Sequence, residues 1–292
     1  LDAYGTQVIH QAWKPVTVFL NGKYWGHMNL RERVDRFFIA QFEGLSLDQA
    51  DEMDILEANG SVNFGSNKAY RAMLKKIKAG SPATNPDDLQ YILDNVDVDN
   101  LFEYMALEMF VGNSDIGNIR YYRLHQEGSK WKWIWYDADY GLYSSKFNSP
   151  WSYLKVKGMG EQKIDNTIFL KLLEHPDYKR KFLEKLADVY KTFTTEYMTQ
   201  VLDGVVAEIQ PEMKNHWERW GELNDKAVTS EVPTTIDGAY TYWESRVNRL
   251  YNTLKVRPHR LWDFIKDEFK LTKTEMEELF GPQPDYPDDA VL

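Results

Sequence analysis

The most constraining part of the sequence is residues 113–141, NSDIGNIRYYRLHQEGSKWKWIWYDADYG, in which acidic and amide side chains flank two strand-like segments. Residues 119–124 and 131–136 are rich in β-branched and aromatic residues, and the polar segment between them contains a glycine. This pattern predicts an antiparallel hairpin. In such a hairpin the start of the first strand faces the end of the second.

The hairpin is expected to bring four polar side chains to one end of a sheet. Asn118 and Asp137 should lie nearly opposite one another, and Asp115 and Asp139 should lie just beyond them at the same end. Three carboxylates and an amide suit a hard divalent cation. Because Asp and Asn are also common turn residues, the pattern alone leaves two interpretations open, a metal or phosphate site and an ordinary turn.

Length, charge and cysteine content narrow the classes of protein. A chain of 292 residues has room for one large domain or two joined ones. Its formal net charge of −10 argues against a general nucleic-acid binder, although a local basic patch could still bind phosphate. The absence of cysteine excludes a disulfide framework, a thiolate metal site and a cysteine nucleophile. From the negative net charge we expect no nucleic-acid partner. No apolar run is long enough to predict a membrane span.

The rest of the chain predicts an α+β protein with strands in its first half and helices in its second. Asn21-Gly22 between two apolar segments predicts a tight hairpin. Residues 30–42 then change to helical spacing, and 142–165 form a long connection. Other expected elements are a short strand at 54–56, loops at 59–67 and 81–88, and helices at 68–78, 89–95, 101–111 with Asn100 as N-cap, 167–174, about 176–191, 196–209, 212–220, 239–254 and 258–269.

Several motifs, taken in order, resemble one known family. Residues 19–35, FLNGKYWGHMNLRERVD, resemble the Asn-Gly hairpin and following Leu-x-Glu of CotH-type spore coat kinases. Residues 111–123, VGNSDIGNIRYYR, are similar to the Asn-x-Asp…Asn-x-x-Tyr-Tyr motif of that family. Residues 131–141, WKWIWYDADYG, are similar to its Trp-Asp-x-Asp motif, with Tyr136 in place of the usual Trp.

Two helical segments extend the resemblance towards the C-terminus. They are residues 168–190, IFLKLLEHPDYKRKFLEKLADVY, and 246–258, RVNRLYNTLKVRP. The resemblance covers roughly residues 14–271, and it depends on the order and spacing of the motifs together.

The resemblance implies an atypical protein-kinase-like fold with a small β-rich part and a mostly helical C-terminal lobe. One kinase domain would occupy residues 1–280, with 1–58 as the remnant of the nucleotide lobe, 59–280 as the helical lobe and 115–139 as the active-site hairpin. Residues 281–292, acidic and rich in proline, are expected to be disordered.

The implied activity is transfer of the ATP γ-phosphoryl group to Ser or Thr of a protein substrate, with Mg²⁺ or Mn²⁺. Such a protein would be bacterial and extracytoplasmic, either secreted, on the cell surface or in the spore coat.

The resemblance also implies roles for individual residues. Asp115 would be the catalytic carboxylate, and Asn118 would bind the metal and nucleotide. Asp137, together with Asp139, would take the role of the metal-binding aspartate. Glu32 would be the helix-borne acid that orients a phosphate-binding cation.

Two features depart from an ordinary kinase. Asp115 and Asn118 are closer in sequence than the corresponding kinase pair, which fits an atypical kinase. No Gly-rich phosphate loop or strand-borne lysine precedes the Asn-Gly hairpin. The cations near that hairpin are Lys14, Lys23, Arg31 and Arg33.

Two other classes of function therefore stay open. One is a non-catalytic pseudokinase or extracellular binding module. The other is a glycosidase that would use Asp115 and Asp137, which would then lie about 5–9 Å apart, with tryptophans stacking on sugar. The six scattered histidines show no zinc-binding spacing, and no Gly-x-Ser-x-Gly elbow indicates a serine hydrolase.

Overall fold

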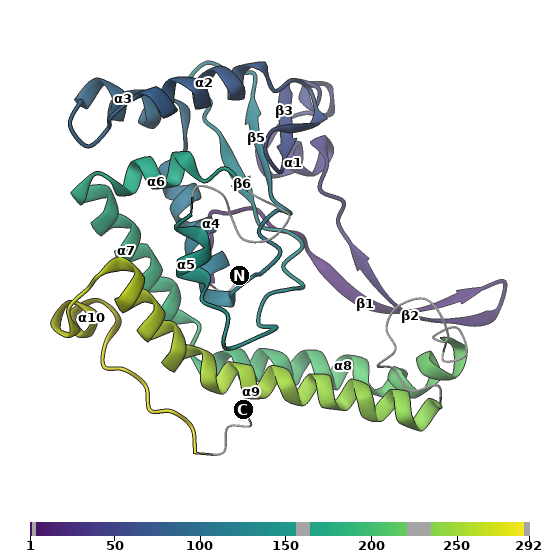
Figure 1. The fold of residues 1–292 in the computed structure, drawn as a ribbon. Helices are drawn as coiled ribbons and strands as arrows, with labels where there is room; N and C mark the ends of the chain where they lie inside the picture. Colours follow the sequence, from purple (N-terminus) through teal and green to yellow (C-terminus); the bar gives the residue numbers. More distant parts are fainter. Residues whose placement is uncertain (2–3, 156–163, 221–234, 289–292) are drawn as a thin grey trace. The chain divides into compact units, whose positions relative to one another are not determined.

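The computed structural model describes residues 1, 4–155, 164–220 and 235–288, and its architecture is α+β, as predicted (Figure 1). The chain divides into two compact units, which are described separately. Unit 1 comprises Leu1–Gln11, Arg33–Thr192 and Arg257–Asp285. Unit 2 comprises Ala12–Glu32, Phe193–Val256 and Tyr286–Leu292.

Unit 1 contains an antiparallel four-stranded sheet in the order β4-β3-β5-β6. Its strands are β3 (Met53–Glu57), β4 (Ser61–Phe64), β5 (Arg120–Leu124) and β6 (Lys132–Ile134). The predicted central hairpin is therefore present as β5 and β6, and β3 pairs with β5 across the boundary expected at residue 58.

Both faces of this sheet are covered, which explains why neighbouring residues of β5 are buried. Tyr122 faces a core that includes Phe38 and Ile39 of α1 (Arg36–Phe42). Tyr121 faces the other way, and its ring lies 4.7 Å from that of Tyr70 on α2 (Lys68–Ala79). Successive strand residues point to opposite faces, so a doubly covered strand reads as a continuous apolar run.

Helix α4 (Val98–Val111) is the central helix of unit 1, and residues on all of its sides are buried. Phe102 of α4 packs against Phe169 and Phe182 of two neighbouring helices. The other helices of this unit are η2 (Leu47–Gln49), α3 (Pro86–Asn95), α5 (Ser149–Tyr153), α6 (Thr167–Leu173), α7 (Pro176–Thr192) and α10 (Lys273–Phe280).

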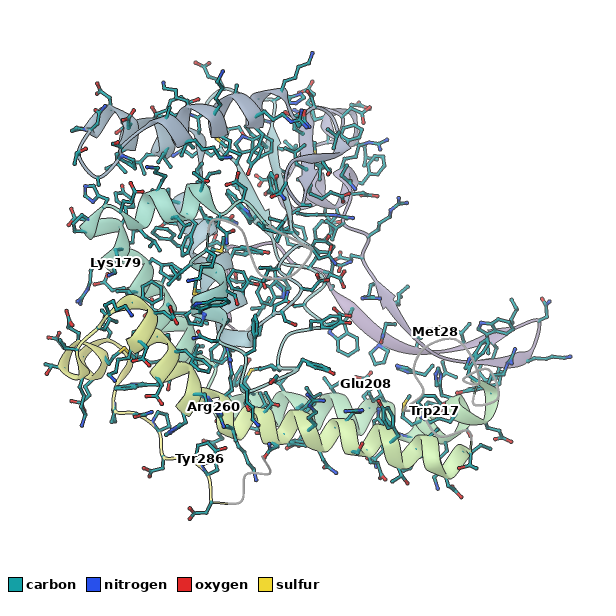
Figure 2. The ribbon with its side chains drawn as sticks, in the orientation of Figure 1. Met28, Lys179, Glu208, Trp217, Arg260 and Tyr286 are labelled. Atoms are coloured by element: carbon teal, nitrogen blue, oxygen red, sulfur yellow. The ribbon has the colours of Figure 1, made fainter. Side chains whose placement is uncertain are left out.

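The last part of α9 (Ile236–Phe269) also belongs to unit 1 and is held by side-chain hydrogen bonds. Lys179 of α7, labelled in Figure 2, donates to the carbonyl of Phe269 at 3.1 Å. A lysine there satisfies a free carbonyl at the helix end and complements its partial negative charge. Trp262 donates to the carbonyl of Gly281 at 3.1 Å, so the first residue of the predicted acidic tail contacts α9.

Unit 2 contains the Asn-Gly hairpin, formed by β1 (Trp13–Leu20) and β2 (Lys23–Arg31). Asn21 and Gly22 have φ values of 52° and 77°, which are the left-handed conformations that a two-residue hairpin turn requires. The hairpin was predicted with this turn.

The hairpin packs on α8 (Thr195–Trp220), where Trp220 donates to the carbonyl of Trp25 at 2.7 Å. Helices α8 and α9 run antiparallel within this unit, since Asp203 contacts Tyr251 and Gln210 contacts Tyr240.

Several predicted boundaries are wrong, mostly because partners distant in sequence decide them. Leu30 lies in β2 because it pairs with Lys14, and the following helix starts only after its N-cap Asp35. Asp97 caps α4 in place of Asn100. Asn100 is buried and instead exchanges hydrogen bonds with the backbone of Trp133 on β6.

The other differences between predicted and observed elements concern a short strand, a helix that begins at a proline, two helices that continue through a proline, and a short helix in a predicted connection. The predicted loop 59–67 contains β4, and α3 begins at Pro86 inside the predicted loop 81–88. Each pair of helices expected on the two sides of Pro211 and of Pro258 is a single helix. The predicted connection 142–165 contains α5, and its residues 156–163 lie outside the described residues. In the described ranges, no helix is both long and apolar enough to cross a membrane.

Candidate functional site

The end of the β5–β6 hairpin brings together the two side chains predicted to face each other. The Asn118 amide donates a hydrogen bond to a carboxylate oxygen of Asp137. Tyr136 donates through its hydroxyl to the amide oxygen of Asn118. Burial raises the pKa of the Tyr136 hydroxyl, so it stays a donor near neutral pH. The geometric prediction for Asn118 and Asp137 is therefore confirmed.

Asp137 and Asp139 have different surroundings, although only one residue separates them. Asp137 is half-buried and has a φ of 54°, a left-handed conformation that Asp adopts more readily than most residues. Asp139 is exposed and lies in a tight turn closed by the hydrogen bond from the Gly141 amide to the Ala138 carbonyl. No hydrogen bond among the described residues joins Asp139 to Asn118 or Asp137.

Asp115 lies in the loop between α4 and β5, residues 112–118, which we call the Asp115 loop. Its amide donates to the side-chain oxygen of Asn113 at 3.0 Å, and its carbonyl accepts from the amide of Asn118 at 3.2 Å. The backbone of Asp115 therefore links Asn113 to the Asn118–Asp137 pair.

The expected convergence of three carboxylates is not observed. Within the part of the chain that the structure describes, no three His, Cys, Asp or Glu side chains are grouped so that they could hold a metal ion. The remaining donor set is the Asn118 amide and the Asp137 carboxylate. An asparagine and an aspartate are the metal ligands of protein kinases, so this donor set fits Mg²⁺ or Mn²⁺. The metal-binding roles themselves stay a prediction.

Glu32 does not lie on a helix, contrary to the prediction. It follows β2 in unit 2, and its carboxylate accepts from the amide of Ala12 at 2.9 Å. Its own amide donates to the Ala12 carbonyl at 3.2 Å, so Glu32 closes the open end of the β1–β2 hairpin.

Arg120 is the cation that the sequence interpretation missed. Its guanidinium lies over the Tyr136 ring at 4.7 Å and 3.5 Å from a carboxylate oxygen of Glu57 on β3. It also donates to the carbonyl of Val34 at 2.7 Å. Arg120 begins β5 two residues after Asn118, and it contacts Tyr136, whose hydroxyl donates to Asn118. The signal available in the sequence was an arginine within the predicted strand 119–124.

A buried carboxylate, that of Glu108 on α4, is hydrogen-bonded to the Asp115 loop through Asn113. Glu108 is only 1% exposed and accepts from the Tyr153 hydroxyl at 2.7 Å. The side chains of Tyr104 and Asn113 also hydrogen-bond to it. Burial raises the Glu108 pKa to about 7, although these hydrogen bonds oppose the shift. The charge of Asp115 adds to the rise.

Arg257, on α9, binds the C-terminal end of α4. It is 1% exposed and donates to the carbonyls of Met109 and Phe110, at 2.9 and 3.2 Å. It also donates to the Phe147 carbonyl and, at 2.6 Å, to the Ser149 hydroxyl. Burial lowers the Arg257 pKa to about 9, so it remains charged at neutral pH. Its donors therefore occupy carbonyls that the last turn of α4 leaves without helical partners.

Comparison with known proteins identifies one family. A family model described as CotH kinase protein matches residues 3–261 of the chain. No curated protein matches it.

Proposed function

The chain belongs to the CotH kinase family, and we propose that it is an atypical protein kinase that transfers the γ-phosphoryl group of ATP to Ser or Thr of another protein. The family supports a kinase-like role in general. The observation that supports catalysis by this chain is the pairing of Asn118 with Asp137 at a sheet end, beside the loop that carries Asp115.

Each polar group at this end has a defined task in the proposal. Asn118 and Asp137 would hold Mg²⁺ or Mn²⁺ through oxygen ligands. When bound, the metal neutralises phosphate charge as the phosphoryl group is transferred. Asp115 orients the acceptor hydroxyl and takes its proton, which requires the Asp115 loop to keep a fixed position. Asp139 is exposed and shares no hydrogen bond with Asn118 or Asp137 among the described residues, so the proposal gives it no role in holding the metal.

We assign phosphate binding to Arg120 and its orientation to Glu57. Kinases pair a strand-borne lysine with a glutamate for this task. Arg120 and Glu57 lie on neighbouring strands, and their charged groups are 3.5 Å apart. Arginine can hold phosphate oxygens through two parallel hydrogen bonds, so this pair can replace lysine and glutamate. In this assignment Glu57 takes the role first expected for Glu32.

The proposed acceptor is a protein outside the cytoplasm, in the spore coat or on the cell surface. This placement comes from the family resemblance, and the lack of cysteine agrees with it. Phosphosite mapping by mass spectrometry after incubation with extracytoplasmic proteins tests it. Phosphate on Ser or Thr supports the proposal, whereas phosphate confined to other residue types contradicts it.

The direct test is transfer of labelled γ-phosphate from ATP with Mg²⁺ or Mn²⁺ to a protein acceptor. Wild type should transfer, and Asp115→Asn should bind ATP normally but lose transfer by about 100-fold or more. Thermal unfolding with ATP and metal, compared with EDTA, reports binding independently, because a ligand of the native state raises the midpoint.

Folded wild-type protein that binds nucleotide without transfer would identify a pseudokinase. Folded protein that neither binds nor transfers would favour a binding module. Transfer that survives Asp115→Asn would place the active site elsewhere.

A further inference from the structure

A second buried glutamate on α4 shows how unusual Glu108 is. Glu103 and Glu108 are both nearly fully buried on this helix. A carboxylate oxygen of Glu103 lies 4.0 Å from the ammonium of Lys185, so it has a counter-charge. Among the described residues no cation is paired with Glu108. A buried carboxylate without a counter-charge is costly, so hydrogen bonds must offset part of that cost.

The partners of Glu108 supply these hydrogen bonds. The three side chains that hydrogen-bond to it, Tyr104, Tyr153 and Asn113, act as donors. An asparagine side chain has one donor end and one acceptor end. Because Glu108 takes the donor end of Asn113, the acceptor end is directed at the amide of Asp115, 3.0 Å away. A neutral apolar residue at position 108 would leave the Asn113 amide free to rotate.

We propose that Glu108 is a positioning residue that fixes the Asp115 loop through Asn113. The backbone strengthens the connection, since the Glu108 carbonyl accepts from the amides of Gly112 and Asn113 at 3.0 and 3.3 Å. Gly112 has a φ of 63° and ends α4, so the chain turns sharply from the helix into the Asp115 loop at this residue. This inference rests on the proposed kinase function for its catalytic consequence, but its structural part is independent of activity.

The kinetic test compares Glu108→Gln with Glu103→Gln, a matched change on the same helix. Glu108→Gln keeps the shape and one acceptor but removes the charge that orients Asn113. We expect kcat for phosphoryl transfer to fall about 10- to 100-fold, because small displacements of a catalytic group are costly. KM for ATP should stay within about twofold, since Asn118 at the end of the loop is also held by Asp137 and Tyr136. Glu103→Gln should leave kcat within about twofold. Equal kcat values for the two variants would overturn the proposal.

The pH dependence of kcat provides a readout that a purely structural role would not change. The titratable groups that face Glu108 are Tyr104 on α4, Tyr153 on α5 and Asp115 in the loop. Tyr104 and Tyr153 stay protonated at neutral pH because burial raises the pKa of both hydroxyls. Wild-type kcat should therefore fall as pH drops through about 7, where Glu108 becomes protonated, and Glu108→Gln should lack this step. A step that persists in Glu108→Gln would contradict the proposal.

Amide hydrogen exchange separates failure of this inference from failure of the kinase proposal. If folded wild type transfers no phosphate, the kinase proposal fails, but exchange in residues 112–118 still tests Glu108. Faster exchange there in Glu108→Gln, with Glu103→Gln like wild type, supports positioning. Unchanged exchange overturns it. Should Glu108→Gln not fold, Tyr153→Phe removes one hydrogen bond to Glu108 and should accelerate exchange in the same segment. Wild-type exchange in that variant would count against the proposal.

Discussion

Two buried ionisable side chains, Arg257 of α9 and Glu108 of α4, form hydrogen bonds at the C-terminal end of α4, and neither forms a salt bridge among the described residues. Arg257 donates mainly to backbone carbonyls, those of Met109, Phe110 and Phe147. Glu108 accepts from side chains, one of which, Asn113, reaches the Asp115 amide. The hydrogen bonds of Arg257 to backbone carbonyls stabilise the helix end. The hydrogen bonds of Glu108 to side chains connect it, through Asn113, to the Asp115 loop.

This difference indicates different purposes for two equally buried ionisable side chains. Arg257 connects the end of α4 to the segment before α5, so replacing Arg257 should mainly lower the stability of the fold. Glu108 favours one conformation of the Asp115 loop, so replacing Glu108 should mainly lower kcat. Buried charges can therefore be sorted by what their partners do.

The largest effect should come from Arg257→Met, which keeps the length but removes every donor. The variant loses the hydrogen bonds from Arg257 to three carbonyls and to the Ser149 hydroxyl, although Ser149 still donates to the Met109 and Phe147 carbonyls. We expect the free energy of unfolding to fall by about 3 kcal/mol or more, because each hydrogen bond to a charged group contributes about 1.5–3 kcal/mol. Urea denaturation measures it, with Lys255→Met, an exposed cation of α9, as a control that should change little. A loss below about 1 kcal/mol would show that Arg257 does not hold the helix end.

The next effect is a dependence of stability on pH at Glu108. Its pKa is about 7 in the folded protein, above the ordinary value of 4.5, so folding favours the protonated form. The stabilisation is complete below about 4.5 and is lost as pH rises through about 7, by up to about 3 kcal/mol. The difference in unfolding free energy between wild type and Glu108→Gln, measured at pH 5 and pH 8, should change accordingly. A difference independent of pH would mean that Glu108 does not ionise in a buried site.

A smaller effect is expected at the half-buried end of β5 and β6, where water screens charge. Asp137→Asn removes one charge from the proposed metal site and should weaken Mn²⁺ binding about 10-fold or more. Calorimetric titration measures the affinity, and Asp139→Asn is the comparison because Asp139 is exposed and two residues away. Equal losses in the two variants would show that the turn, and not Asp137 alone, holds the metal.

The smallest effect should come from Tyr136→Phe. The Tyr136 hydroxyl donates to the Asn118 oxygen that a metal would use, so its removal frees that oxygen. We expect Mn²⁺ affinity to rise about threefold, in line with the loss of one modest competing hydrogen bond. Tyr140→Phe removes an exposed hydroxyl nearby and serves as control. Weaker binding in Tyr136→Phe would show that the hydroxyl orients Asn118 for metal instead of competing with it.

The sequence predicted the parts of the molecule that depend on local pattern. An Asn-Gly turn was sufficient to predict the first hairpin, and two β-branched and aromatic segments around a polar turn were sufficient to predict the central one. Antiparallel geometry was then sufficient to bring Asn118 near Asp137. It failed where partners distant in sequence decide. Leu30 fits a helical pattern until its pairing with Lys14 is known.

Within the site, the same limit applied more strongly. Glu108 reads as a polar position in an apolar helix, and only the packing of α5 shows that Tyr153 buries it. The role of Arg257 could not be predicted from the sequence either, because its partners near residues 109 and 147 lie far away in sequence. Arg120, by contrast, could have been noticed as a cation within the predicted strand 119–124.

The proposed site is tested most directly by the position of Mn²⁺ in crystals grown with a non-hydrolysable ATP analogue, located by anomalous diffraction. We expect the metal to be bound to side-chain oxygens of Asn118 and Asp137, with the γ-phosphate reaching Arg120. Metal and nucleotide bound away from Asn118 and Asp137, in protein folded as described, would contradict it.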